Sequence, residues 1–164
     1  MAKIPAAPRF PHSLWDRLTN PDLLVGESSD ATATSRLDRL RREVLAHVEW
    51  ILNARCCVGA AIEGSEILRS SLVGYGLPDI SGLRTGDPRD RGQLERMIED
   101  VIRRFEPRLK DVRVEFNAAA RDAASTTLNY RVSAVIKVKP IAQPILFDTV
   151  LELGGRAFQV RGPG

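Results

Sequence analysis

The sequence predicts an α+β fold, in which two main amphipathic helices pack on a small antiparallel sheet that contains a long C-terminal hairpin. Three observations predict it. Apolar residues recur at helical spacing before Glu106, they alternate at strand spacing after Arg108, and Glu106-Pro107-Arg108 separates the two patterns. Helices followed by strands in one chain are typical of the α+β class.

Composition limits the classes of protein that fit. The chain has 164 residues, of which 43% are hydrophobic and 27% charged, as in a globular domain with its own core. Its 24 Lys and Arg are interleaved with 21 Asp and Glu, so we expect no nucleic-acid partner. No apolar run approaches the ~20 residues of a membrane span, and none follows Lys3 as a secretory signal would. We therefore expect a cytoplasmic protein without membrane insertion.

Cysteine and histidine spacing argues against a metal or disulfide framework. Cys56 and Cys57 are adjacent and are the only cysteines, and neighbouring cysteines rarely bridge each other. His12 and His47 lie far apart in the sequence, so no zinc-ligand spacing exists. We expect no metal, no cofactor and no small-molecule substrate.

The N-terminal residues 1–34 are predicted to form a flexible arm with one short amphipathic helix, ahead of a single domain over residues 35–164. Ser13 can cap that helix, and Leu14, Trp15 and Leu18 fall within one turn. Trp15 has two interpretations. It is either a docking anchor for another protein or a core side chain folded back on the domain.

The first long helix is predicted from about residue 36 to 54, with Ser35 as its N-cap. Apolar residues repeat there at three and four positions, and the stripe consists of Leu37, Leu40, Val44, Val48 and Ile51. His47 lies on the flank of this helix. No nucleophile is spaced to meet it, so we do not expect a catalytic role.

The pattern breaks between Ala54 and Gly86, where a short helical turn is expected after Gly64-Ser65-Glu66. Gly74-Tyr75-Gly76-Leu77-Pro78-Asp79 follows, and its composition is that of a turn. Two glycines flanking a tyrosine can also indicate a phosphate loop. No Lys-Ser/Thr pair follows them, so the structural interpretation is favoured.

The second long helix is predicted to begin at Asp87-Pro88, an N-cap followed by a proline suited to the first turn, and to run to about Phe105. Strands are expected over residues 112–116, 128–138, 145–153 and 157–161. Pro140 to Pro144 should form the turn of the long hairpin. In that hairpin the spacing would permit cross-strand pairs of Lys137 and Lys139 with Asp148 and Glu152.

Carboxylates invite an enzymatic interpretation, which the surrounding residues weaken. Glu63 and Glu66 lie in a Gly/Ser-rich loop without a visible partner. Glu106 has Arg104 and Arg108 beside it, and their charges should lower its pKa and prevent it from acting as a general acid. We expect no catalysis.

Binding suits the same residues better. Pro107 fixes the directions in which the Glu106 carboxylate and the Arg108 guanidinium point, as a bidentate contact with another protein requires. A sheet of three or four strands also leaves an edge that could accept a further strand. The alternative interpretation of Glu106-Pro107-Arg108 is a helix stop with two solvated charges.

Three segments carry a resemblance to a known family. Phe105-Glu106-Pro107-Arg108-Leu109 after an amphipathic helix, the Gly74–Asp79 turn and the early Ser13–Leu18 segment together resemble the gp25-like family of contractile-injection baseplates. Within it, the chain is most similar to the type VI secretion baseplate subunits called TssE.

The resemblance implies a non-enzymatic wedge component in the cytoplasm that helps to initiate sheath assembly. Its partners would be other wedge subunits and sheath proteins, contacted through Glu106, Pro107, Arg108 and Leu109, with Trp15 as a further candidate. Two alternatives stay open. One is a peptidoglycan hydrolase with Glu106 as acid, and the other is a small regulatory adaptor of the same fold.

Overall fold

A computed structural model describes residues 18–19, 33–56, 64–84, 86–118, 127–138, 141–155 and 157–162. The chain divides into two compact units, Met1–Val44 and Leu45–Gly164. Helix α2 (Ala33–Asn53) begins in the first unit and ends in the second. Trp15 lies outside the described residues, so its role stays a prediction, as does the domain boundary at residue 34.

Helix α2 confirms the first predicted helix but corrects its start. It begins at Ala33, so Ser35 lies inside the helix and not at the N-cap position. Threonines and a serine follow one another here, and composition alone could not choose the cap among them. The predicted apolar stripe is buried. It comprises Leu37, Leu40 and Val44 in the first unit and Val48 and Ile51 in the second, where Leu52 is buried as well.

The segment after α2 contains the short helix α3 (Glu66–Arg69), the 3₁₀ turn η3 (Leu72–Gly74) and the glycine-flanked turn. Gly76 has a φ of 97°, and a Cβ there would lie 2.4 Å from the carbonyl oxygen of Ala54. The backbone N–H of Leu77 donates to the same oxygen at 2.8 Å. Glycine is therefore needed to hold this turn against the end of α2.

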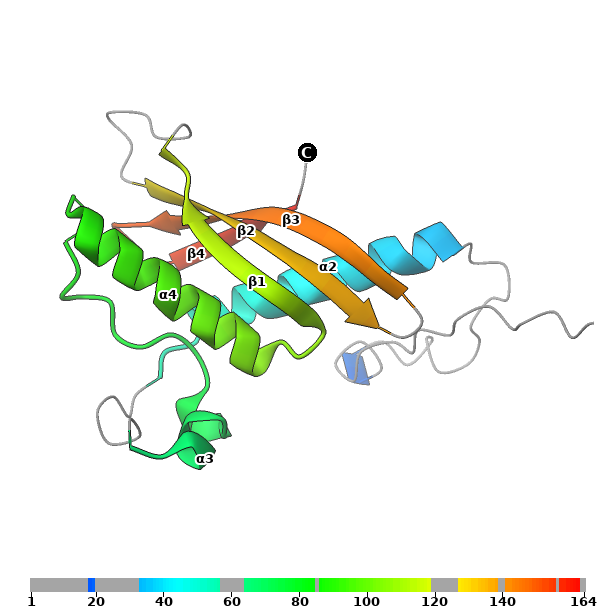
Figure 1. Cartoon of the computed structure of the whole chain (residues 1–164), viewed down its shortest axis with the longest axis horizontal. Coiled ribbons are helices and arrows are strands. Elements are labelled where there is room, and N and C mark those ends of the chain that lie inside the picture. The colour runs from blue at the N-terminus through cyan, green and yellow to red at the C-terminus, as the bar shows by residue number, and fades with distance from the viewer. Residues whose placement is uncertain are drawn as a thin grey trace, which may run out of the picture. The chain divides into compact units, whose positions relative to one another are not determined.

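Helix α4 (Pro88–Phe105) matches the second predicted helix. The side chain of Asp87 accepts a hydrogen bond from the N–H of Arg89 at 2.8 Å, as expected of an N-cap. The helix lies beside strand β1 (Figure 1). Its buried face consists of Leu94, Ile98, Val101 and Ile102.

The sheet has four antiparallel strands in the order β1 (Leu109–Phe116), β2 (Thr127–Val138), β3 (Ile141–Glu152) and β4 (Ala157–Arg161) (Figure 1). Strand β1 begins at Leu109 and not at Val112, because Leu109 and Lys110 already pair with β2. The register then shifts between Lys110 and Arg113. Asp111 sits in this irregularity with a φ of 53°. The bulge interrupts the alternation of apolar and polar residues from which a strand is predicted.

The hairpin of β2 and β3 corrects two predictions. Residues 141–144 are part of β3, and Pro144 pairs with Val135 instead of forming a turn. Proline is tolerated there because β4 pairs only with residues 148–152, which leaves this end of β3 without a neighbour on that side. The pairing of β2 with β3 sets a register in which Arg131, and not Lys137, lies 3.2 Å from Asp148, whereas Lys139 lies outside the described residues.

One face of the sheet carries the core of the second unit. Its buried side chains come from all four strands, and they alternate with residues on the opposite face. They include Val112, Val114, Leu128, Tyr130, Val132, Ile136, Ile145, Phe147, Leu151 and Phe158.

The outer edge of β4 is occupied by side chains of α2. The amide of Asn53 accepts from the N–H of Phe158 and donates to its carbonyl oxygen, each at 2.9 Å. The carboxylate of Glu49 accepts from the N–H of Val160 at 2.9 Å. These contacts take the place of a neighbouring strand.

The outer edge of β1 is occupied in the same way by α4. The guanidinium of Arg103 donates to the carbonyl oxygen of Val112 at 2.8 Å. The carboxylate of Glu95 accepts from the N–H of Phe116 at 2.8 Å. Both sheet edges therefore have backbone groups satisfied within the chain, which opposes strand addition by another protein.

Candidate functional site

The Glu-Pro-Arg corner is a hydrogen-bonded turn between α4 and β1. Glu106 ends the helix, and its N–H donates to the carbonyl oxygen of Ile102 at 2.8 Å. The N–H of Leu109 donates back to the carbonyl oxygen of Glu106 at 3.1 Å, with Pro107 at the second position of the turn. The carbonyl oxygen of Arg108 accepts from the N–H of Lys137 at 2.8 Å, which fastens the corner to β2.

The carboxylate of Glu106 points into the protein and is 0% exposed. Its Oε1 accepts from the backbone N–H of Arg108 at 3.1 Å and from Nε at 2.7 Å. Its Oε2 accepts from Nη2 of Arg108 at 2.7 Å and lies 2.6 Å from Nδ1 of His47. All the strong acceptor positions of this carboxylate are used within the chain.

His47 reaches the corner from α2, which the sequence separates from Glu106 by 59 positions. An ionised carboxylate can only accept hydrogen bonds, so Nδ1 of His47 carries a hydrogen and donates a hydrogen bond to Oε2 of Glu106. The imidazole also meets the indole of Trp50 edge to face, with ring centroids 6.5 Å apart. One buried carboxylate thus links the helix to the corner.

The pKa of Glu106 reflects two opposed effects. Burial alone raises it, but the hydrogen bonds from Arg108 and His47, together with their charges, outweigh burial and lower the pKa to about 2. The predicted lowering is confirmed, but Arg104 has a different partner. Its guanidinium pairs with Asp100 at 2.8 Å.

This arrangement suits a structural ion pair and not acid catalysis. A general acid must hold a proton near neutral pH, whereas Glu106 is ionised there and its oxygens are occupied. Glu66 is exposed on α3, 3.8 Å from a nitrogen of Arg69, and Glu63 lies outside the described residues.

The glycine-flanked turn also reaches the corner. The ring of Tyr75 packs against the ring of Phe105, the last residue of α4, with centroids 5.1 Å apart and an interplanar angle of 65°. Burial raises the pKa of Tyr75, and the negative charge of Glu106 raises it further. Two segments that were singled out separately in the sequence are therefore neighbours in the fold.

The five predicted binding residues have different environments. Glu106 and Leu109 are buried, Pro107 is exposed, and the side chain of Arg108 is 29% exposed. Trp15 lies outside the described residues. Pro107 and Arg108 are therefore the members of this set that reach the surface among the described residues.

Sequence reasoning missed Trp50, whose side chain is 50% exposed. A signal for it existed, because position 50 lies off the apolar stripe that runs through Val48, Ile51 and Leu52. An aromatic residue on the polar face of a helix is a candidate for contact with another protein. The pairing of His47 with Glu106 left no comparable signal.

Comparison with known proteins identifies the family. The sequence model of the family described as "Baseplate wedge protein gp25" matches residues 38–141, which include most of α2, the whole of α4, β1 and β2, and the whole Glu-Pro-Arg corner. A search of curated proteins gave no match. No helix formed by the described residues is both long and apolar enough to cross a membrane. The match covers well over half of the chain, which therefore belongs to the gp25-like family of baseplate wedge proteins.

Proposed function

We propose that this chain is a structural wedge subunit in the baseplate of a type VI secretion system, that it works in the cytoplasm, and that it helps to initiate sheath assembly. Its partners are other wedge subunits and sheath proteins. Membership of the baseplate wedge family supports the structural role. The observation that best supports a binding site at the corner is the buried carboxylate of Glu106. This carboxylate holds the guanidinium of Arg108 in place through two hydrogen bonds.

The residues of the corner have different roles in the proposed binding. Glu106 is saturated with internal hydrogen bonds, so it positions Arg108 and does not itself contact a partner. The partly exposed guanidinium of Arg108 and the ring of Pro107 form the contact surface. A guanidinium that is already held in place loses little conformational entropy when a partner carboxylate or carbonyl binds to it.

The proposal is tested by a tagged pull-down from the native cells, read by mass spectrometry, with wild type beside Arg108→Glu. Wild type should bring down wedge and sheath proteins, and the variant should not. Arg113→Glu, which reverses an exposed arginine on β1, is the matched control and should behave as wild type. Failure of wild type to capture any baseplate protein would overturn the proposed function.

Arg108→Glu also places a second carboxylate next to the buried Glu106, so the variant could lose its partners because it unfolds. A second control therefore separates the loss of a contact from the loss of stability. Ile98→Ala removes a fully buried side chain of α4 and lowers stability without touching the corner. It should retain the partners at a temperature at which the folded fractions of the two variants are equal. Equal loss of partners by both variants would show that Arg108 is not a contact residue.

A further inference from the structure

A cluster of exposed apolar side chains lies on α3 and η3, away from the residues that hold Glu106. Ile67 is 82% exposed and Leu72 is 88% exposed, and Leu68 and Val73 are also exposed. No residue of α3 is buried. Single exposed apolar residues are normal on a protein surface, but four within seven positions form a patch that favours contact with another molecule.

Polar caps, and not burial, fix the conformation of this patch. The hydroxyl of Ser65 accepts from the N–H of Leu68 at 3.4 Å, and that of Ser71 accepts from the N–H of Val73 at 3.2 Å. A Cβ at Gly74 would lie 2.3 Å from the carbonyl oxygen of Arg69, so glycine is needed there. The apolar side chains are thus presented on a backbone that is already ordered, which reduces the entropy lost on binding.

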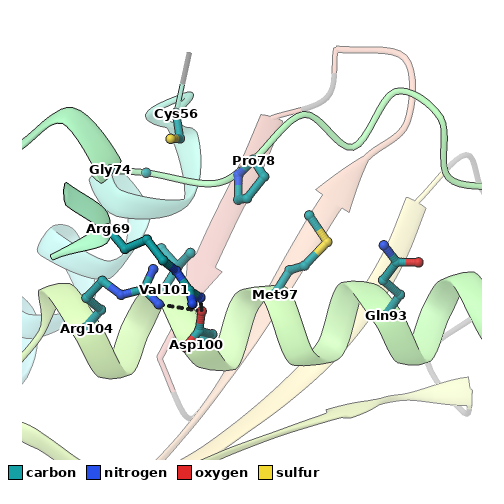
Figure 2. Close-up of a pocket in the computed structure, with 10 residues that line it drawn as sticks. Cys56, Arg69, Gly74, Pro78, Gln93, Met97, Asp100, Val101 and Arg104 are labelled. Carbon is teal, nitrogen blue, oxygen red and sulfur yellow. Dashed lines mark hydrogen bonds and ion pairs between the residues drawn. The ribbon is translucent and has the colours of Figure 1, made fainter. Parts of the chain in front are cut away.

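The patch borders a groove of about 450 Å³ between this segment and α4. Figure 2 shows Met97 pointing from α4 toward the segment that carries Pro78, and Val101 lies one turn further along the helix. Arg69 of α3 and Gly74 of η3 also line the groove, and each is the sequence neighbour of a patch residue, Leu68 and Val73 respectively. The volume of the groove falls within the range of ligand-binding clefts.

One end of the groove is lined by two arginines and one carboxylate, and Arg69 also lies 3.8 Å from the exposed carboxylate of Glu66, which does not line the groove. The guanidinium groups of Arg69 and Arg104 converge on a single oxygen of Asp100, at 3.2 Å and 2.8 Å (Figure 2). A guanidinium has five N–H donors, so two of them sharing one carboxylate oxygen retain donors for another acceptor. A carboxylate is the acceptor that matches the fork of an arginine best.

We propose that this groove is a second docking surface, and that it binds a segment of another baseplate subunit in which aliphatic side chains stand next to an Asp or Glu. The aliphatic side chains pack on Leu72, Ile67 and Met97. The carboxylate binds to Arg69 and Arg104. The identity of the partner as a baseplate subunit rests on the proposed function, but the surface is separate from the contact surface of Arg108 and Pro107.

A second copy of this chain fits the groove less well than a different protein. Its exposed apolar Leu146 on β3 has an acidic neighbour, Asp148, but that carboxylate is already paired with Arg131 at 3.2 Å. Arg131 would compete with the groove for this carboxylate. We therefore assign the groove to a different chain, and self-association is an outcome that the test must detect.

The experiment places a photo-crosslinking amino acid at position 72 of the full-length chain in the native cells. A matched chain carries it at position 113, on the exposed face of β1. The crosslinked peptides are sequenced by mass spectrometry. Position 72 should crosslink to a baseplate protein at aliphatic residues within a few positions of an Asp or Glu, and position 113 should not crosslink to that segment.

Charge exchange then tests the chemistry of the contact. Arg69→Glu and Leu72→Ser should each reduce capture of the crosslinked partner at least about tenfold. Replacing the acidic residue of the partner by Arg should restore binding to Arg69→Glu but not to Leu72→Ser. Arg96→Glu, which reverses an exposed charge on α4 that does not line the groove, is the control and should bind as wild type.

Three outcomes would overturn the inference. They are a crosslink at position 72 no stronger than at position 113, a crosslink to a second copy of this chain, and a failure of the charge exchange to restore binding. Each can occur while wild type still captures wedge and sheath proteins through the corner. A wrong assignment of the groove is therefore distinguishable from a wrong function.

Discussion

Nδ1 of His47 lies 2.6 Å from Oε2 of Glu106, although 59 positions separate the two residues. This contact joins α2 to the turn between α4 and β1 through a carboxylate that has no solvent exposure. The Glu-Pro-Arg corner is consequently part of the packed interior on one side and part of the surface on the other. Substitutions at its three residues should therefore differ in their effects.

Glu106→Gln should destabilise the protein by about 3 kcal/mol, because it removes the negative charge to which Arg108 and His47 donate and leaves their donors poorly matched. Urea unfolding followed by circular dichroism measures the loss. Glu115→Gln, on the exposed face of β1, is the control and should stay within about 0.5 kcal/mol of wild type. Equal stability of the two variants would contradict the internal role of Glu106.

Acidification should remove the advantage of wild type over Glu106→Gln. The pKa of Glu106 falls from its ordinary value of 4.5 to about 2 in the folded state, so its contribution is complete above pH 4.5 and is lost as the pH falls toward 2. The difference in unfolding free energy between the two proteins should shrink by on the order of 3 kcal/mol over that range. A difference that stays constant with pH would show that the carboxylate is not held in its ionised form.

Asn53→Ala should open the outer edge of β4, because the amide of Asn53 both donates to and accepts from the backbone of Phe158. We expect a loss of about 1 to 2 kcal/mol and faster hydrogen exchange at the amide of Phe158. Gln159→Ala removes an exposed side chain of the same strand and should leave that exchange rate unchanged. Unaltered exchange in Asn53→Ala would mean that the edge is protected by something else.

Gly76→Ala should destabilise the turn that contacts the end of α2. Its φ of 97° is unfavourable for alanine, and the new Cβ would lie 2.4 Å from the carbonyl oxygen of Ala54. The expected loss is more than about 1 kcal/mol in thermal or urea unfolding. Gly82→Ala has no atom within 4 Å of the new Cβ, so it provides the matched control and should be nearly neutral.

Tyr130→Phe should leave the stability unchanged or increase it by about 1 kcal/mol. The hydroxyl of Tyr130 is buried and has no hydrogen-bond partner among the described residues. Burial, together with the charge of Glu95, raises the pKa of Tyr130 to about 12, so the hydroxyl keeps its proton at ordinary pH. A clear loss of stability in thermal unfolding would reveal a partner for this hydroxyl.

The sequence by itself determined the fold class and most of the elements. Local spacing of apolar residues marks the buried face of a helix or strand, and Asp87-Pro88 and Glu106-Pro107 mark where α4 begins and ends. The β-bulge near Asp111 and the paired strand around Pro144 were missed. Both depend on the neighbouring strand, which spacing along one chain does not reveal.

Only the tertiary structure decided what the corner does. The sequence places Arg104 and Arg108 at similar distances along the chain from Glu106, but α4 directs Arg104 to Asp100 while the turn folds Arg108 back onto the carboxylate. His47 reaches the same carboxylate from a different helix. Contacts between residues far apart in the sequence follow from how the elements pack, so their hydrogen bonds and the pKa that they set emerge only when the chain is folded.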